Sequence, residues 1–415
     1  MDDIYPDILY NDLKFKNNKE TLIIILLFFF SLFARIPVIL ILGDVTLDNE
    51  WGILLYNLIN HNTLSLQKFD EFLLPNLWLP PLYAYYLYLL SFLNFENQDF
   101  VLLVLLSQVI LASISVVIFY KLNKFFFSKK ISTYSSLLFS FFPLYLYSSA
   151  QISSISLTIF LAIFFYYFFF KIKKDKKYID VLIYAFIGGL LILVRREFIA
   201  IIILSSFYLF LFCKISFKKI LLIFLITLIT ISPYLMRNYI IFEKIIIHSG
   251  FGYNLWKGNN PNSKVEGSDK NVILQNYLIE EIPKDKFYRI NEDKIYIKES
   301  IKNIKEDPKK YFFLYVKKAL SYFFIDIEST KPNYYNPFHY IPNLLLAITS
   351  LIGIFLSDKK SSSFNYLILI LSFYLFVFPI FAILPRYKIY IIPFQIIFTN
   401  IFINYLIKKR RQRVT

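Results

Sequence analysis

Long apolar runs constrain the fold of this chain more than any other feature. A helix needs about 20 mostly apolar residues to cross the hydrocarbon of a bilayer. Stretches that approach this length lie at 21–42, 100–120, 131–149, 154–171, 178–194, 198–213, 218–236, 341–357, 364–384 and 388–407. Hydrophobic residues make up 57% of the chain, whereas soluble domains contain about 45–50% and cover themselves with polar side chains. We therefore predict an all-α polytopic membrane protein with about ten transmembrane helices.

The short loops between these stretches agree on one orientation. Basic segments follow the second, fourth, sixth, eighth and tenth stretches, and read KLNKFFFSKK, KIKKDKK, KISFKK, SDKK and KKRRQR. All of them fall on one side of the membrane, and short cytoplasmic loops carry the excess of Lys and Arg. We expect both termini in the cytoplasm and the protein in the cytoplasmic (inner) membrane.

The remaining polar segments then lie on the outer side. The chain divides into 1–236, with seven helices and a first outer loop at 43–99; 237–340, a long outer loop; and 341–415, with three helices and a basic tail. Segment 309–324 alternates apolar and basic residues, which indicates an interfacial amphipathic helix in a helix-rich outer loop. Segment 71–92 is apolar but broken by three prolines, so we expect interfacial helix there rather than a further span.

Several function classes are disfavoured by composition and motifs. The net charge of +16 is concentrated between apolar runs, which favours membrane-flanking charge over nucleic-acid binding. The three histidines share no metal-ligand spacing, and a phosphate-binding loop with Lys-Ser/Thr and a Gly-x-Ser-x-Gly motif are both missing from the sequence. The single cysteine, Cys213, allows no intrachain disulfide.

Acidic residues follow the first apolar stretch directly. The segment GDVTLDNEWGILLYNLI places Asp44, Asp48 and Glu50 where the chain leaves the membrane. One interpretation is structural, because Asp48 could cap a helix that begins near Asn49. The other is a general base held at the membrane surface.

Arginines stand at the outer ends of the helices. They are Arg195 and Arg196 in LVRREF, Arg237 in PYLMRNY and Arg386 in LPRYKIY. Short outer loops normally avoid such charges, and guanidinium binds phosphate in a two-pronged way. Snorkelling to lipid headgroups would explain any one of them, but explains the whole set less well.

The segment GFGYNLWKGNNP, residues 250–261, is polar and rich in glycine. Its glycines permit tight turns, and its asparagine amides suit sugar hydroxyls. Trp256 could stack on a sugar ring or anchor in the interface. We expect a turn-forming loop at the outer face.

Together these segments resemble the GT-C glycosyltransferases, in the branch related to protein O-mannosyltransferases and the lipid A aminoarabinose transferase. In that branch an acid after the first helix heads a surface helix, which DNEWGILLYNLI resembles. The family's Pro-Pro-Leu-Tyr stands at 80–83, and LVRR at 193–196 and PYLMRN at 233–238 are similar to its arginine motifs. NLWKGNNP resembles a Gly-Asn-rich loop, and PRYKIYIIP a closing Arg-Tyr motif. One departure is SSISLTIF at 153–160, where many members carry an acid.

The resemblance implies an enzyme that moves a sugar from a polyprenyl-phosphate donor to an acceptor hydroxyl or amine at the outer face, with inversion. The acceptor would be a lipid, a glycan or a protein. Asp48 or Glu50 would be the catalytic base. Residues implied to bind substrate are Arg195, Arg237, Asn238, Asn254, Trp256, Asn259, Asn260, Arg386 and Tyr387. No cofactor is certain, although the two neighbouring acids could hold a divalent cation.

Two other functions compete with sugar transfer. An enzyme like the O-antigen polymerases would also have outer arginines and a large outer loop, but the acid after the first helix argues against it. A transporter would place polar groups near the midplane on broken helices, whereas the apolar stretches here are nearly free of charge.

Overall fold

The computed structural model describes residues 6–95, 97–269 and 279–412. Its first half contains α1 Pro6–Leu42, α2 Glu50–His61, β1 Ser65–Phe69, β2 Phe72–Pro75, α3 Leu82–Ser91, α4 Asn97–Asn123, α5 Lys129–Phe141, α6 Pro143–Ser148, α7 Ile155–Asp175, α8 Tyr178–Val194 and α9 Phe198–Leu211. Its second half contains α10 Phe217–Phe242, α11 Phe251–Asn259, α13 Tyr288–Glu306, α14 Pro308–Phe323, α15 Pro337–Leu356, α16 Ser362–Val377, η1 Phe378–Ile380, η2 Pro385–Tyr390 and α17 Ile392–Gln412.

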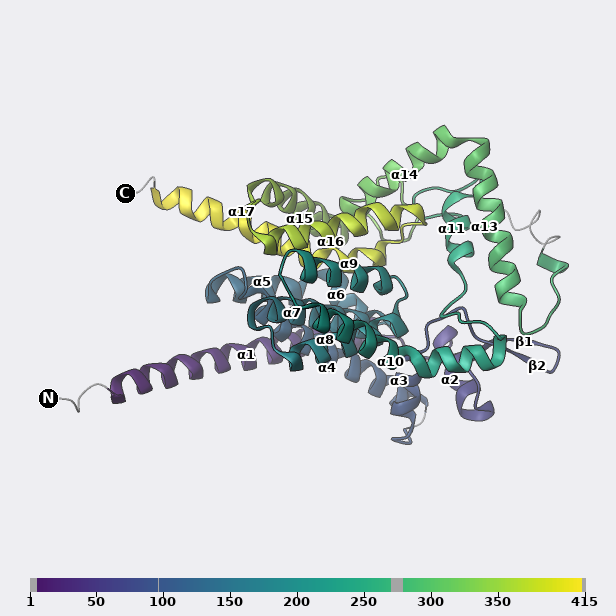
Figure 1. The fold of residues 1–415 in the computed structure, drawn as a ribbon, viewed down its shortest axis with the longest axis horizontal. Coiled ribbons are helices and arrows are strands. Elements are labelled where there is room, and N and C mark those ends of the chain that lie inside the picture. Colours follow the sequence, from purple (N-terminus) through teal and green to yellow (C-terminus); the bar gives the residue numbers. More distant parts are fainter. Residues whose placement is uncertain (1–5, 96, 270–278, 413–415) are drawn as a thin grey trace.

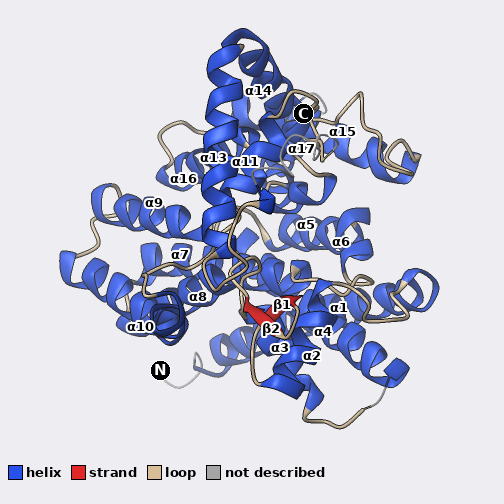
Figure 2. Ribbon diagram, turned by 90° about the vertical axis from the view of Figure 1, so that its right-hand side faces the viewer, coloured by secondary structure: helices blue, strands red, loops and turns tan. Residues whose placement is uncertain are grey.

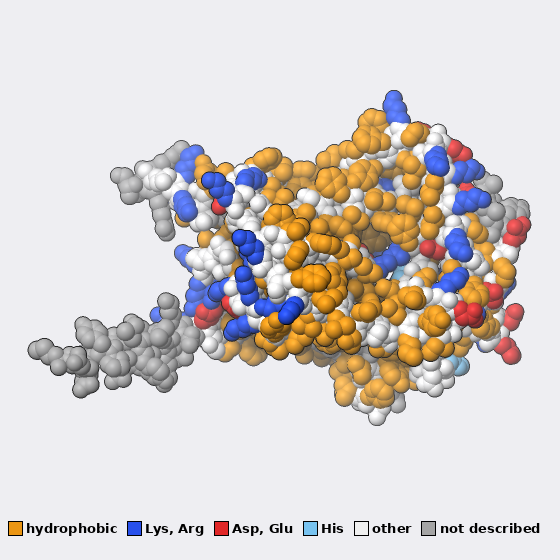
Figure 3. Space-filling view, viewed as in Figure 1, with side chains coloured by type: hydrophobic (Ala, Val, Ile, Leu, Met, Phe, Trp, Pro, Cys, Tyr) orange, Lys and Arg blue, Asp and Glu red, His pale blue; other side chains and the backbone are white. Residues whose placement is uncertain are grey.

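Most of the long helices run side by side, with both chain ends at one end of the bundle and α11, α13 and the strands at the other (Figure 1). Six helical segments of the described chain are long and apolar enough to cross a membrane: Lys19–Leu42, Gln98–Asn123, Ile155–Asp175, Phe217–Phe242, Pro337–Leu356 and Ser362–Ile380. Figure 3 shows a broad apolar band, with Lys and Arg gathered on the side of the chain termini and Lys, Arg, Asp and Glu mixed at the opposite end. The helical membrane architecture is thus confirmed.

The predicted number of about ten spans is not confirmed. The stretch 131–149 is divided into α5 and α6, because Pro143 has no amide hydrogen for a continuous helix and begins a new one. Helices α8 and α9 have 17 and 14 residues, fewer than the roughly 20 that a straight crossing needs.

Close helix contacts in the bundle depend on small residues. At Gly353 in α15, an added Cβ would lie 1.8 Å from the backbone oxygen of Phe398 in α17. The side chains of Thr349 and Thr399 hydrogen-bond across the same helix pair at 2.9 Å. Small residues let backbones approach where lipid supplies no hydrophobic drive.

The prediction that the helix interiors are nearly free of charge is wrong at Arg35. This arginine lies within the first apolar helix and is only 1% exposed. Its guanidinium donates to the backbone oxygen and hydroxyl of Ser31 and to the hydroxyl of Ser140. The span Lys19–Leu42 has 24 residues, so at about 1.5 Å per residue Arg35 lies about 10 Å from its Leu42 end and about 7 Å from its middle.

The first outer loop contains a β-hairpin that the all-α prediction missed. Strands β1 and β2 pair antiparallel, from Ser65 opposite Pro75 to Phe69 opposite Phe72. Seen from the outer end, the hairpin lies near α2 and α3, with α11, α13 and α14 beyond it (Figure 2). The sequence signal is weak because the strands have only five and four residues. The hairpin and α3 occupy most of segment 71–92, which was predicted to form an interfacial helix.

The helix predicted at 309–324 is confirmed as α14, residues Pro308–Phe323. Its Lys318 is 0% exposed, and its ammonium group donates to the backbone oxygen of Gly258 at 2.7 Å. Burial disfavours the charged form and lowers the pKa of Lys318 to about 7.

Replacing Gly353 by Val should destabilise the bundle, because the new side chain collides with backbone rather than with a movable side chain. We expect the melting temperature in detergent to fall by roughly 5 °C or more. Gly188→Ala is the control, since its Cβ would meet side-chain atoms and no backbone, the nearest being the end of the Ile202 side chain at 3.1 Å. Equal melting temperatures for the two variants would contradict the close contact.

Burial of Lys318 predicts a pH dependence of stability. The pKa of Lys318 is about 7 in the folded protein, whereas in the unfolded chain it has the usual lysine value of 10.5. The unfolded state therefore binds more protons between these two pH values. As pH increases through this range, Lys318 raises the free energy of unfolding by up to about 1.4 kcal/mol per pH unit. Lys318→Met should flatten the increase in thermal stability between about pH 7 and 9, whereas Lys309→Met, at an exposed position of the same helix, should retain it.

Candidate active site

The first outer loop is fastened to the junction between α6 and α7. Asp44 donates its backbone amide to the oxygen of Ala150 at 3.0 Å, and its carboxylate accepts from the amide of Ile152 at 2.6 Å. The side-chain amide of Asn49 donates to the oxygen of Ile152 at 3.0 Å. Two successive parts of the loop are therefore held by the same short segment of backbone.

Asn49, not Asp48, caps α2. The Asn49 side chain accepts from the backbone amides of Trp51 and Gly52, at 3.0 and 3.4 Å, as an asparagine at this position commonly does. The capping role proposed for Asp48 is therefore wrong, because its carboxylate does not accept from the first amides of α2. Asp48 and Glu50 are both exposed, and neither carboxylate has a hydrogen-bond or ion-pair partner among the described residues.

Asp48 differs from Glu50 because it lines a cavity. The cavity has a volume of about 420 Å³ and is bounded by residues 45–48, by Leu55 and Ile59 of α2, and by side chains near the end of α3 and the start of α4. This size falls within the range of ligand pockets. The cavity thus favours Asp48 over Glu50 as the carboxylate that meets a substrate.

The motif PPLY places a tyrosine behind this loop. Tyr83 is buried, packs edge-on against Trp51 and donates its hydroxyl to Gln108 of α4 at 2.9 Å. Gln108 in turn donates to the backbone oxygen of Gln151 at 3.1 Å. The motif therefore supports the surface that carries the acids, rather than facing solvent.

Arg195 and Arg237 stand at the same level on neighbouring helices. Thr227 of α10 donates its hydroxyl to the oxygen of Ala185 in α8 at 3.1 Å. Both helices run toward the end of the bundle opposite the chain termini. Arg195 follows Ala185 by ten residues, and Arg237 follows Thr227 by ten residues. Their backbones thus reach the outer side together.

Arg195 and Arg237 both keep unsatisfied donors. Arg237 donates to the backbone oxygen of Asn76 at 3.1 Å and to the side chain of Asn238 at 2.7 Å, but its Nη2 is buried without a partner. The Nε of Arg195 is likewise buried and unpaired. Buried unpaired donors are rare and call for an acceptor.

The closing motif PRYKIY forms η2 and brings its tyrosines toward Arg195. Burial lowers the pKa of Arg195, but the phenol of Tyr390, together with Glu197 and Tyr387, outweighs it and the net pKa is raised. Arg386 is exposed, with its guanidinium 5.9 Å from the Tyr387 ring centroid. Of the predicted residues, the structure therefore associates Arg195 with Tyr387.

The segment α6 joins this motif to the first loop. The Tyr145 hydroxyl donates to the backbone oxygen of Ile389 in η2 at 2.7 Å. Ala150 and Ile152, which follow α6, hold Asp44. The acids and the closing motif are therefore positioned by a single short segment.

A pair between Arg196 and His248 was missed by the sequence analysis. Arg196 Nη1 lies 2.8 Å from His248 Nδ1. Because guanidinium only donates, that imidazole nitrogen accepts. Burial and the Arg196 charge together hold the pKa of His248 well below its usual value. No local pattern marks this histidine, which is 52 positions away in sequence.

Most of segment 250–261 is the helix α11, Phe251–Asn259, and not the expected loop. α11 begins after Gly250, which has the left-handed φ of 101° that glycine tolerates. Asp293 of α13 accepts from the backbone amides of Gly250 and Gly252, at 2.7 and 2.8 Å. This carboxylate satisfies amides that the first turn leaves free, and helix formation follows.

The polar and aromatic side chains of α11 mostly face inward. Trp256 is 2% exposed and packs beside Tyr296, so it is not presented to a sugar in this structure. Asn254 donates to the oxygen of Gly250, Asn259 to those of Leu255 and Ile380, and Asn260 to that of Ser268. These amides stabilise the outer layer, formed by α11 and α13. The segment is thus a helix rather than a loop, and sugar binding by its residues stays a prediction.

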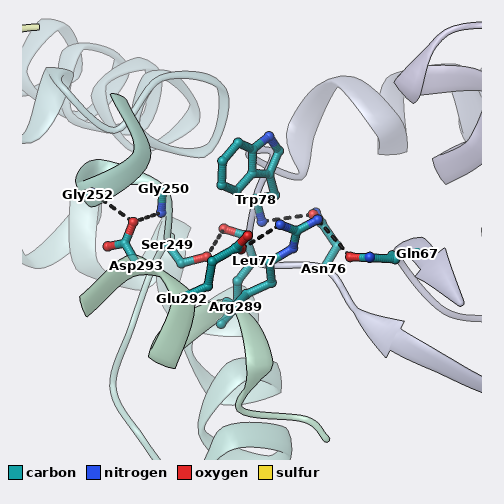
Figure 4. A network of polar contacts seen from close by, with 10 residues as sticks. All are labelled: Gln67, Asn76, Leu77, Trp78, Ser249, Gly250, Gly252, Arg289, Glu292 and Asp293. Atoms are coloured by element: carbon teal, nitrogen blue, oxygen red, sulfur yellow. Dashed lines mark hydrogen bonds and ion pairs between the residues drawn. The ribbon is translucent and has the colours of Figure 1, made fainter. Parts of the chain in front are cut away.

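Trp78 connects the first loop to the outer layer (Figure 4). The guanidinium of Arg289 lies 4.9 Å from the Trp78 ring centroid and is held by Glu292 and Gln67. Tyr253 packs edge-on against the Trp78 ring, with 4.9 Å between the ring centroids. The ring therefore bridges residues from the hairpin side, α11 and α13.

The described residues contain no group of three or more His, Cys, Asp and Glu side chains able to hold a metal ion. A divalent cation held by fewer carboxylates together with a substrate phosphate stays a prediction.

Asp293→Ala should loosen α11, because two amides lose a charged acceptor. We expect roughly tenfold faster hydrogen exchange for amides in 250–259, which corresponds to a loss of about 1.4 kcal/mol. Hydrogen exchange with mass spectrometry would measure it, and Lys294→Ala, an exposed neighbour, is the control. Unchanged exchange in the Asp293 variant would contradict the capping role.

The chain resembles known proteins in one family and one fold. Residues 79–236 match the family described as dolichyl-phosphate-mannose-protein mannosyltransferase. No curated protein matches in sequence.

Solved structures of an oligosaccharyltransferase from Archaeoglobus fulgidus share the fold. One, named AglB and solved with an inhibitory peptide and a dolichol-phosphate, has 15% identity and a TM-score of 0.58, and covers 95% of this chain and 51% of its own. Another, tethered to an acceptor peptide, has 14% identity and a TM-score of 0.59, with coverages of 95% and 50%. The present chain thus spans about half the length of these structures. The family match and the shared fold confirm the predicted resemblance to the GT-C glycosyltransferases.

Proposed function

We propose that this protein is an integral-membrane glycosyltransferase that moves a sugar from a polyprenyl-phosphate donor to an acceptor hydroxyl or amine, with inversion. The observation that carries the proposal is the free carboxylate of Asp48 at a cavity beside the membrane rim. The family match over 79–236 supports this reaction class. The similar AglB structure, which was solved with a dolichol-phosphate, supports a lipid-linked donor.

The site would lie on the outer side of the cytoplasmic membrane. The basic short loops and both termini are at one end of the bundle (Figures 1 and 3), and the positive-inside rule makes that end cytoplasmic. We propose that α8, α9, α17 and the pair α5–α6 complete ten crossings with the six longer helices. Tilt and packing against neighbours would accommodate their shorter lengths.

The unpaired donors of Arg195 and Arg237 suit the phosphate of the donor. A phosphate oxygen would satisfy the Nε of Arg195 or the Nη2 of Arg237, which have no acceptor in the described protein. As the bond to the sugar breaks, negative charge grows on the leaving phosphate, and guanidinium in a water-poor site stabilises it. Arg386 is exposed and would meet the phosphate as it arrives.

The reaction proceeds by one displacement. Asp48 takes the proton of the acceptor hydroxyl, and the oxygen attacks the anomeric carbon from the face opposite the phosphate. The carbon–oxygen bond to the phosphate breaks, and its electron pair leaves with the polyprenyl phosphate. No step is assigned to a divalent cation, because the described acids do not form a ligand cluster.

Asp48→Asn should reduce sugar transfer by about 10²–10⁴-fold, since the amide cannot accept the proton. Glu50→Gln should keep activity near that of the parent, because Glu50 does not line the cavity. Cells lacking the protein would be complemented with each variant, and their envelope glycans compared by mass spectrometry for one missing sugar. Full transfer by Asp48→Asn would overturn the assignment of the base.

A further inference from the structure

The cavity beside Asp48 is unusually apolar for a site that receives a sugar acceptor. Seven of its eleven lining residues are apolar, and Asp48 is the one that carries a charge. Leu55 and Ile59 of α2 form one wall, and Phe100 and Val101 of α4 form another. A hydrophilic peptide or glycan would gain little from such walls, whereas hydrocarbon would be stabilised by burial there.

The surface around the cavity is also apolar and exposed. Ile41 and Leu42 at the end of α1 are 78% and 54% exposed, and Val45 is 70% exposed. Phe92 and Phe95, between α3 and α4, are 63% and 51% exposed. α1 and α4 include two of the membrane-crossing segments and lie together. The cavity therefore borders a surface suited to lipid, rather than one suited to water.

We propose that the acceptor is a membrane lipid with a free hydroxyl, whose hydrocarbon chain enters this cavity from the bilayer. This inference rests on the proposed function, because the base must contact the acceptor and Asp48 is among the residues that line this cavity. The lipid hydroxyl gives its proton to Asp48, and its oxygen forms the new bond to the anomeric carbon. The sugar–phosphate bond breaks, which yields a glycosylated lipid and a free polyprenyl phosphate.

The arrangement separates the two lipid substrates. We assign the donor phosphate to Arg195, which follows α8, and to Arg237, near the end of α10. We assign the acceptor hydrocarbon chain to the cavity between α2 and α4. Two amphipathic molecules would then approach from different sides of the bundle, with their polar ends at the outer face.

Photolabelling of the reconstituted full-length protein tests the assignment. The probe is a diacylglycerol with a diazirine in one acyl chain, and labelled peptides are mapped by mass spectrometry. We expect labels on α2 and at the start of α4. Ile59→Trp should fill the cavity and reduce labelling roughly tenfold. Ile53→Trp, on the same helix but outside the cavity lining, should leave it unchanged.

Three results would overturn the lipid assignment. They are labels on other elements, equal labelling of the two tryptophan variants, or competition by a polyprenyl phosphate, which would assign the cavity to the donor chain. If Ile59→Trp fails to fold, Val101→Phe narrows the same cavity from α4.

The proposed function can survive failure of this inference. Sugar transfer to a Ser/Thr peptide that depends on Asp48, without cavity labelling, would leave the glycosyltransferase intact and remove the lipid acceptor. If Asp48→Asn keeps both sugar transfer and cavity labelling, Asp48 is not the base.

Discussion

The hydrogen bond from the Ile152 amide to the Asp44 carboxylate, at 2.6 Å, is the contact on which the proposed site depends most. It fastens the first outer loop to the junction of α6 and α7, and Asn49 reinforces it through the same residue. α6 also supports the closing motif through Tyr145. A carboxylate acceptor makes a stronger bond than a neutral one, so Asp44 positions the acids while leaving Asp48 free.

Three arginines have buried guanidinium nitrogens, although only Arg35 is buried as a whole residue and Arg195 and Arg237 are half-buried. Arg35, Arg195 and Arg237 each keep a buried nitrogen without an acceptor. Arg35 is surrounded by serine hydroxyls and lies beneath the outer surface, whereas Arg195 and Arg237 reach the outer ends of α8 and α10. Unsatisfied donors in a low-dielectric setting are costly. Their persistence at the outer ends is accounted for most simply by an anionic substrate.

The outer layer is held to the first loop by aromatic and charged contacts, not by a flexible Gly-Asn segment. Trp78 contacts Arg289 and Tyr253, while Asp293 completes the first turn of α11. GFGYNLWKGNNP looks like a loop because glycine and asparagine are poor helix formers. A carboxylate 43 positions later in sequence overrides that local preference.

The sequence by itself determined the helical membrane character, the grouping of basic loops and the order of the motifs, because hydrophobic length and loop charge are local properties. It also indicated the helix at Pro308–Phe323. Only the tertiary structure decided that Asn49 caps α2, that Asp48 rather than Glu50 lines a cavity, that Trp256 is buried, and that Arg196 meets His248. The Asn49 cap is local, at two and three residues, but asparagine and aspartate stand side by side there and both suit a cap. The other outcomes depend on which distant segments come into contact, such as Arg196 and His248 across 52 positions, and no local pattern of residues specifies such a contact.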